Sequence, residues 1–229
     1  MGHLPHIASG NHYICETNLR ISSLLMLFDD QYRTIEKIAE GLFRDKGSRF
    51  ISYAIPVTSE TEVKDQLEIL RKKYYDATHH CYAFVLGSEK SAWRANDDGE
   101  PSGTAGRPIY GAIQSADLTN ILIVVIRYYG GVKLGVPGLI NAYRTAAKEA
   151  ISGAPVVTRT VCEVYRVEYP YERMNEVMKI LKDEGTTVIS TDFGMTCVVE
   201  FAIRRNDVNR VLVRFERQNG LSVNHLKTI

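Results

Sequence analysis

The stretch ILIVVIRYYGGVKLGVPG, residues 121–138, decides the architecture of the N-terminal half of this chain. Its first part, residues 121–126, is an unbroken apolar run rich in β-branched side chains, which is typical of a strand buried on both faces. Glycines follow, and Pro137 stands where the first turn of a helix tolerates proline. Residues 139–151 are good helix formers. We therefore predict a central strand, a glycine-rich loop and a helix.

A second glycine-rich stretch, DDGEPSGTAGRP, occupies residues 97–108. Glycine is used where the backbone takes positive φ or where another group approaches closely, so both stretches are predicted to be irregular loops that face a ligand. This stretch leads into a short helix predicted at residues 109–116, for which Ser102 or Thr104 is a candidate cap. The free N–H groups at a helix start favour an anion.

The remaining N-terminal elements follow from hydrophobic periodicity and turn residues. A helix begins at residue 59, with Ser59 or Thr61 as its cap and acidic residues in its first turn. Together with the stretches above, we predict strand, turn and strand over residues 32–57, a helix over 59–75, a strand at 81–86 and a paired strand at 92–95.

Beyond the Gly-Pro break at residues 152–155 the order of elements changes. The pattern predicts strand 161–169, helix 171–183, strand 187–192, strand 196–203, helix 207–217 and strand 221–225. This β-α-β-β-α-β order is that of a ferredoxin-like domain. We predict an α+β protein with domains at residues 29–154 and 155–229, and a leader at residues 1–28 that lies outside the fold.

Composition restricts the classes of function. The chain has 229 residues, 28 Lys and Arg against 27 Asp and Glu, and a net charge of +1, so any contact with nucleic acid must rest on a local patch. The cysteines are widely separated, and no apolar run approaches the ~20 residues that span a bilayer. Walker A and dinucleotide spacings are absent. We expect a cytoplasmic protein with no cofactor, no metal and no membrane partner.

The loop after residue 126 has a coherent binding chemistry. Arg127 and Lys133 offer two cations beside free N–H groups, and Tyr128 and Tyr129 can stack on bases. Arg144, with Lys148 one helical turn later, adds a basic ridge. The alternative is a plain turn with solvated charges. The candidate binding residues here are Arg127, Tyr128, Tyr129, Gly130, Gly131, Lys133, Gly135 and Arg144.

The acidic turn and the histidine pair upstream suggest a different chemistry. Asp97, Asp98 and Glu100 fit turn and capping roles, or a metal site if they converge with His79 or His80. A Cys81–histidine pair would need a third group to orient it. The candidate binding residues of this region are Asp98, Glu100, Ser102, Gly103, Thr104, Gly106, Arg107 and His80.

Three motifs together resemble the YigZ/IMPACT family: HHCYA at residues 79–83, NDDGEPSGTAG at 96–106 and RYYGGVKLG at 127–135. The resemblance runs from about residue 32 to the C-terminus and keeps the family's order of motifs. It implies a two-layer α/β N-terminal domain similar to the second domain of a small-subunit ribosomal protein and to domain IV of elongation factor G. It implies a C-terminal domain similar to domain V of that factor.

The same resemblance implies a role in translation, because eukaryotic IMPACT is similar to regulators of translation under amino-acid stress. Our leading hypothesis is a non-enzymatic cytoplasmic protein that contacts RNA, the ribosome or translation factors, with a protein partner as a further possibility. The alternative is a metal- or histidine-dependent hydrolase or peptidase that uses His79 or His80 with Asp97, Asp98 or Glu100.

Overall fold

The computed structural model describes residues 30–229. The N-terminal half of the chain forms the largest of the sheets in this part of the chain. This sheet has five strands in the order β2-β3-β6-β4-β5, and all neighbouring strands are antiparallel. The apolar run predicted to be central is β6, which lies in the middle of the sheet. The strands are β2 (Ala39–Asp45), β3 (Ser48–Pro56), β4 (His79–Leu86), β5 (Ala92–Asn96) and β6 (Ile121–Tyr128).

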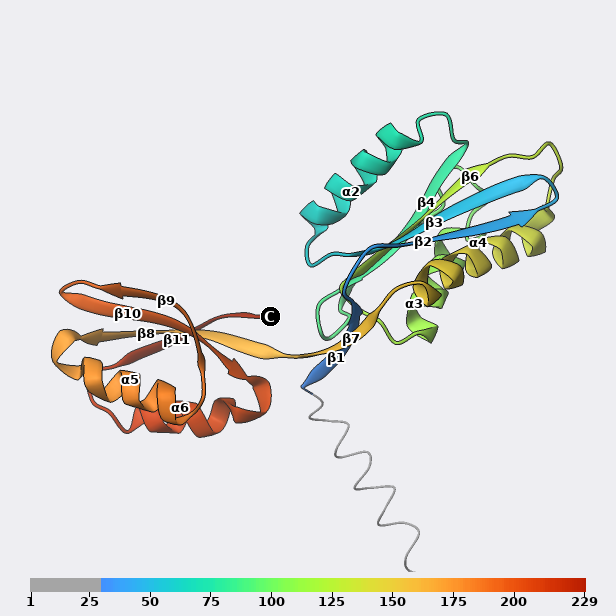
Figure 1. Ribbon diagram of the computed structural model, residues 1–229. Helices are drawn as coiled ribbons and strands as arrows, with labels where there is room; N and C mark the ends of the chain where they lie inside the picture. The colour runs from blue at the N-terminus through green and yellow to red at the C-terminus, as the bar shows by residue number, and fades with distance from the viewer. Residues whose placement is uncertain (1–29) are drawn as a thin grey trace, which may run out of the picture.

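Helices cover both faces of this sheet (Figure 1). Helices α3 (Gly106–Ser115) and α4 (Gly135–Ser152) pack on one face, and α2 (Glu60–Lys73) packs on the other. Both faces can be covered because consecutive residues of β4 and β6 are apolar, so each face of the sheet carries its own core. Helix α2 is thus a third layer beside the two that the resemblance implied.

Of the two caps predicted for α2, Ser59 is confirmed and Thr61 is not the cap. Ser59 is its N-cap residue, and the Ser59 hydroxyl accepts a hydrogen bond from the backbone N–H of Glu62 at 3.2 Å. The Glu62 carboxylate in turn accepts from the backbone N–H of Thr58 at 2.7 Å. The two bonds satisfy donors at the helix start that have no partner within the helix. Within residues 30–229, no helix has both the length and the apolar character that a membrane crossing requires.

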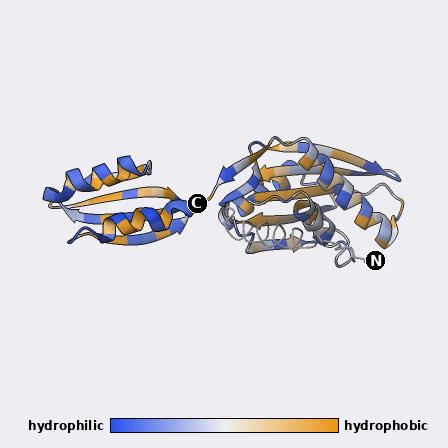
Figure 2. Ribbon diagram, turned by 90° about the horizontal axis from the view of Figure 1, so that it is seen from below, coloured by the Kyte–Doolittle hydropathy of each residue, from blue (hydrophilic) through white to orange (hydrophobic). Residues whose placement is uncertain are grey.

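The C-terminal half has the predicted ferredoxin-like element order, with its strands in the spatial order β11-β8-β10-β9. Helices α5 and α6 lie on one face of this sheet, and apolar residues of the strands and helices form a separate core between them. Hydrophobic and hydrophilic residues alternate along these helices (Figure 2). The elements are β8 (Cys162–Pro170), α5 (Met174–Asp183), β9 (Thr187–Phe193), β10 (Thr196–Arg204), α6 (Val208–Glu216) and β11 (Ser222–Thr228), with short 3₁₀ turns at Tyr171–Arg173 and Arg205–Asp207.

A two-stranded sheet connects the two halves, and the sequence patterns did not predict it. Strand β1 (Gln31–Ile35) pairs antiparallel with β7 (Val156–Thr160). The predicted domain boundary between residues 154 and 155 therefore precedes a strand that pairs with the start of the first half, and the boundary itself stays a prediction. The leader predicted at residues 1–28 lies outside the described residues.

The loop after β6 lies directly against the turn between β2 and β3. A Cβ atom added at Gly130 would come within 2.0 Å of the Gly47 carbonyl carbon and 2.3 Å of the Ser48 nitrogen. The backbone N–H of Gly130 donates to the Ser48 hydroxyl at 3.2 Å, which fixes this approach. Gly130 is thus needed because two backbone segments touch there.

We expect Gly130→Ala to destabilise the protein by about 1–3 kcal/mol, because the new methyl group has to push the β2–β3 turn away. Gly111→Ala is the matched control, since a Cβ at Gly111 meets no atom within 4 Å apart from the backbone of its own helix. Urea denaturation followed by circular dichroism measures both. Equal stability of the two variants would contradict this account of the contact.

Candidate functional site

The two glycine-rich loops meet at a buried charge pair. Nη1 of Arg127, at the end of β6, lies 2.5 Å from Oε1 of Glu100 in the first loop, and the two side chains are 6% and 4% exposed. The hydroxyl of Tyr143 on α4 donates to the same Glu100 oxygen at 2.7 Å. The prediction that Arg127 presents a free cation is therefore wrong. Its guanidinium neutralises a carboxylate inside the fold.

His79 and Cys81 of β4 border this charge pair. Nδ1 of His79 lies 2.8 Å from the Asp98 carbonyl oxygen, and its Nε2 lies 3.8 Å from the Glu100 carboxylate. The Cys81 thiol donates to the Asp97 carbonyl at 3.0 Å. Burial raises the pKa of Cys81 well above its ordinary value, so the thiol stays protonated. A buried, protonated thiol is a structural group and a poor nucleophile.

Asp97 occupies the start of α3, where sequence analysis placed an anion. Its carboxylate accepts hydrogen bonds from the backbone N–H groups of Gly103, Ala105 and Gly106 at 2.8, 3.0 and 2.8 Å. Burial alone would raise the pKa of Asp97, but these N–H donors outweigh it and hold that pKa below its ordinary value. The helix start thus already holds an anion, which belongs to the chain itself.

The expected caps Ser102 and Thr104 do not act as caps. The residue before α3 is Ala105, which makes no side-chain capping bond, and the Thr104 hydroxyl donates to the Pro101 carbonyl at 2.7 Å. Ser102 is exposed. A carboxylate from farther back along the chain replaces the local hydroxyl because the loop folds Asp97 over the first turn of the helix.

Asp98 and His80 are joined through the backbone. The Asp98 carboxylate accepts from the His80 backbone N–H at 2.6 Å and lies 3.8 Å from an Arg71 guanidinium nitrogen. Burial lowers the pKa of His80, so its imidazole is neutral near pH 7.

Asp97, Asp98 and Glu100 each have a separate structural partner. No group of three or more metal-ligating side chains converges within residues 30–229, so the described residues offer no cluster for the metal-dependent form of the hydrolase alternative.

A basic pocket of about 420 Å³ lies between α3 and α4. Arg107 of α3 and Arg144 and Lys148 of α4 line it, and all three side chains are exposed. No carboxylate is part of its lining, and none of the three cations is ion-paired within the part of the chain that the structure describes. The rest of the lining is Gly103, Pro108, Gly111, Ala112, Ser115 and Ile140. The predicted residues Gly103, Arg107 and Arg144 are thus brought together.

Of the other predicted loop residues, Tyr128, Tyr129 and Gly130 lie beside the β2–β3 turn. Tyr129 is 48% exposed, whereas the Tyr128 ring lies under the Arg49 guanidinium at 4.5 Å and its hydroxyl donates to Asp76. Lys133 is exposed. Gly131 and Gly135 have φ values of +85° and +71°, which glycine adopts without strain. Only Tyr129 and Lys133 of this group offer side chains to a ligand.

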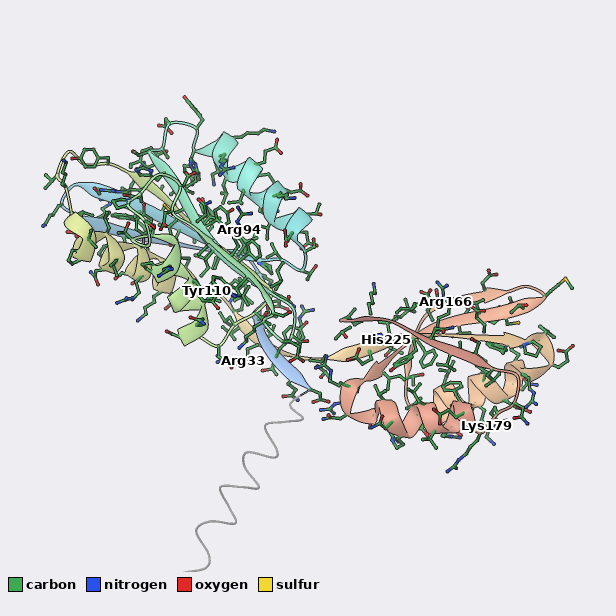
Figure 3. The ribbon with its side chains drawn as sticks, turned by 180° about the vertical axis from the view of Figure 1, so that it is seen from behind. Arg33, Arg94, Tyr110, Arg166, Lys179 and His225 are labelled. Atoms are coloured by element: carbon green, nitrogen blue, oxygen red, sulfur yellow. The ribbon has the colours of Figure 1, made fainter. Side chains whose placement is uncertain are left out.

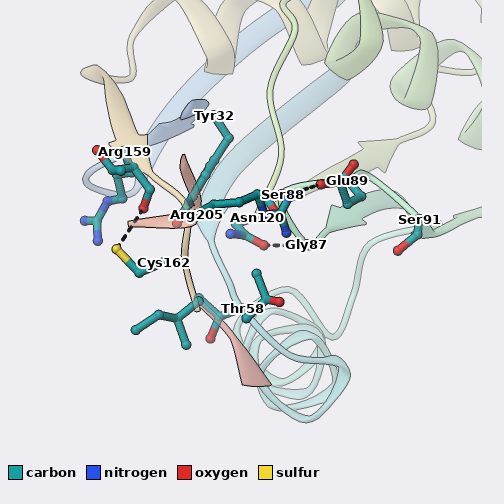
Figure 4. Close-up of a pocket in the computed structure, with 13 residues that line it drawn as sticks. Tyr32, Thr58, Gly87, Ser88, Glu89, Ser91, Asn120, Arg159, Cys162 and Arg205 are labelled. Carbon is teal, nitrogen blue, oxygen red and sulfur yellow. Dashed lines mark hydrogen bonds and ion pairs between the residues drawn. The ribbon is translucent and has the colours of Figure 1, made fainter. Parts of the chain in front are cut away.

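A larger pocket, of about 670 Å³, contains none of the predicted site residues (Figure 4). It is lined by residues of both halves of the chain, among them Tyr32, Asn120 and Arg159. Arg205 is held there by an ion pair with Glu89. This ion pair joins the two halves, and we assign the pocket no ligand.

Tyr143 is the site residue that sequence analysis missed. Its hydroxyl joins Glu100 and Cys81 inside the fold, yet it lies on the buried face of α4 among small residues such as Ala142, Ala146 and Ala147. A tyrosine in a helix face that is otherwise built mostly from alanine indicates a buried polar partner, because a buried hydroxyl needs a hydrogen bond. That signal was present in the sequence.

The sequence and the structure of this chain are similar to those of known proteins, and the similarity includes the residues of this site. Residues 46–151, which contain both glycine-rich loops, match the family model for the Impact N-terminal domain. IMPACT family member YvyE of Bacillus subtilis is 34% identical over 178 residues, which cover 78% of this chain and 82% of that protein. IMPACT family member YigZ of Escherichia coli is 30% identical over 160 residues, 69% of this chain and 78% of that protein. A crystal structure of a hypothetical protein aligns with a TM-score of 0.69 and 26% identity, covering 87% of this chain and 99% of that chain.

We expect Asp97→Asn to destabilise the protein by about 1 kcal/mol at pH 7, because a neutral amide holds the three N–H groups less strongly. The folded-state pKa of Asp97 lies below 3.8, so its contribution is complete above that pH and is lost as pH falls through the folded pKa. The difference between wild type and variant should therefore shrink below about pH 4. Urea denaturation from pH 7 to pH 3 measures it, with exposed Asp192→Asn as control.

We expect Glu100→Gln to cost about 3–5 kcal/mol, because it leaves the Arg127 charge buried without a partner. The double variant Glu100→Gln with Arg127→Met should cost less than the sum of the two single variants. Urea denaturation of wild type, the two single variants and the double variant completes this double-mutant cycle. Exposed Arg144→Gln, expected to change stability by less than about 0.5 kcal/mol, is the control. Additive effects would show that the pair is not coupled.

Proposed function

Because the chain belongs to the IMPACT family, we propose that it is a non-enzymatic protein that binds RNA and acts on the translation machinery in the cytoplasm. The observation that carries the proposal is the basic pocket between α3 and α4, in which Arg107, Arg144 and Lys148 face solvent without a carboxylate. Cations that have no protein partner are free to bind phosphate groups.

The distribution of charges favours this face over the C-terminal half. In the C-terminal half, arginines are engaged with carboxylates: Arg166 pairs with Glu200, Arg204 with Asp30, Arg205 with Glu89 and Glu163, and Arg210 and Arg214 with Glu184. Among residues 30–229, none of the three cations of the α3–α4 pocket forms an ion pair, and Arg107 acts on the Asp97 carboxylate only through longer-range attraction. With a net charge of +1 for the whole chain, such a local cluster is where a polyanion is attracted.

The pocket has the geometry to follow a phosphate backbone. Arg144 and Lys148 are four residues apart on α4 and therefore lie on the same side of that helix, facing Arg107 across the pocket. Lys133 precedes the same helix and Tyr129 lies beside the β2–β3 turn, and neither lines the pocket. Three cations around one pocket suit RNA with several adjacent phosphates better than a single anion.

The role in translation rests on the motif resemblance described above, and a protein of the translation machinery is the competing partner for the same face. Pull-down with and without nuclease separates the two. Association that survives nuclease treatment identifies a protein partner, whereas association that nuclease abolishes is mediated by RNA.

We expect the protein to bind single-stranded RNA with an affinity that falls steeply with salt, measured by fluorescence anisotropy of a labelled oligonucleotide. Arg144→Gln combined with Lys148→Gln removes two phosphate contacts and should reduce the slope of log K against log salt by about 1.4. The loss of affinity should be largest at low salt, where counterion release contributes most.

The matched control is Lys64→Gln combined with Lys179→Gln. It removes the same charge from exposed positions on α2 and α5, away from the pocket (Figure 3 labels Lys179). If the control weakens binding as much as the pocket variant does, the attraction comes from overall charge. Absence of binding at low salt would refute RNA binding altogether.

A further inference from the structure

The single tryptophan of the chain, Trp93, is an exposed residue of β5. It is 53% exposed on the edge strand β5, although a side chain of this size normally gains most by burial. Its indole stacks on the ring of Tyr110 of α3, with ring centroids 4.4 Å apart and an angle of 19° between the planes. One face of the indole is thus covered by Tyr110, and the exposed part includes the other face.

The fold holds this ring pair in place from both sides. Trp93 is paired with Val85 of β4 and therefore points to the side of the sheet on which α3 and α4 pack, whereas the next residue, Arg94, points to the α2 side. Tyr110 packs against the core, and its hydroxyl accepts a hydrogen bond from Gln114 at 3.0 Å. Figure 3 shows Tyr110 and Arg94 on these neighbouring elements.

Strand β5 also runs close to the start of α3, since a Cβ at Gly106 would come within 2.6 Å of the Asn96 nitrogen. This close packing limits movement of β5 relative to α3. The two rings are therefore arranged before any ligand arrives, and stacking a third ring requires no rearrangement.

The ring pair adjoins the basic pocket through Arg107, since neither Trp93 nor Tyr110 is among the residues that line the pocket. Arg107 precedes Tyr110 by three residues on α3, so the two side chains are neighbours on the helix surface, and Gly111 lines the pocket. Neither β5, with the sequence AWRAN, nor α3, with GRPIYGAIQS, contains an acidic residue. An aromatic surface therefore adjoins a cluster of cations with no negative charge on either element.

We propose that Trp93 and Tyr110 form a stacking platform for an unpaired base of RNA whose phosphates lie against Arg107, Arg144 and Lys148. The inference rests on the proposed RNA binding and adds to it the class of RNA, which is single-stranded. A flat base covers the exposed indole face as a third ring of the stack, and every base has a π-face to offer. Bases inside a duplex are already stacked on each other and cannot reach the ring, so duplex RNA would contact only the cations.

Intrinsic fluorescence tests the platform directly, because Trp93 is the only indole in the protein. We expect a single-stranded hexanucleotide of uridine or adenosine to quench this emission as it binds. A duplex of the same base composition should bind through its phosphates and quench much less. Abasic RNA of equal length should bind without quenching, which separates stacking from phosphate contact.

Binding of variants supplies the second readout. Trp93→Leu should weaken single-stranded RNA binding about tenfold, leave duplex binding unchanged and keep the salt slope, because no charge is removed. Trp93→Phe, which keeps a stacking ring, should restore much of the affinity. Tyr75→Leu is the control, since Tyr75 is 86% exposed and lies outside the pocket. Thermal unfolding of each variant verifies that it is folded.

The outcomes separate the two proposals. If single-stranded RNA binds with the expected salt dependence but leaves Trp93 emission unchanged, and Trp93→Leu binds like wild type, RNA binding stands and the platform is refuted. If quenching occurs but Trp93→Leu retains full affinity, the base lies near the indole without being held by it, and the platform is also refuted. If no RNA binds at low salt, both proposals fail.

Discussion

The buried pairing of Glu100 with Arg127 holds the two glycine-rich loops together, and the surroundings of the candidate site depend on it. A charged group removed from water is stable only when an opposite charge and further hydrogen bonds take the place of the solvent. Arg127 and the Tyr143 hydroxyl supply these to Glu100. This contact links the first loop to the end of β6 and to α4, so the helices that line the basic pocket are tied to the central strand.

Asp97 completes the same region by a different interaction. Its carboxylate gathers the backbone N–H groups of Gly103, Ala105 and Gly106, so these donors at the start of α3 are taken by the chain itself. The region rich in charged and glycine residues is therefore mostly structural. The side chains available to a ligand lie on its border, where Arg107, Arg144 and Lys148 surround the pocket and Trp93 stands on the adjoining strand.

The order of elements was largely predictable, because each depends on local periodicity and turn residues. The apolar run of β6, the Ser59 cap of α2 and the β-α-β-β-α-β order of the C-terminal half were all confirmed. The pairing of β1 with β7 was not predicted. The two strands are short and lie about 120 residues apart in the chain, so their pairing leaves no local pattern in the sequence. The third layer was not predicted either, because a helix pattern does not say which face of a sheet the helix covers.

For the site, the sequence by itself determined which chemistry is available: the cations, the acidic turn, the tyrosines and the glycines that let two backbones approach. Only the tertiary structure decided which of these groups neutralise one another and which face solvent. Arg127 and Arg144 are the same residue type, both belong to the glycine-rich loop and helix region, and no local pattern separates them. The difference arises because the chain brings Glu100 next to Arg127 across 27 residues, while Arg144 meets no carboxylate within the described part of the chain. Pairing of charges depends on distance in space, which sequence spacing does not specify.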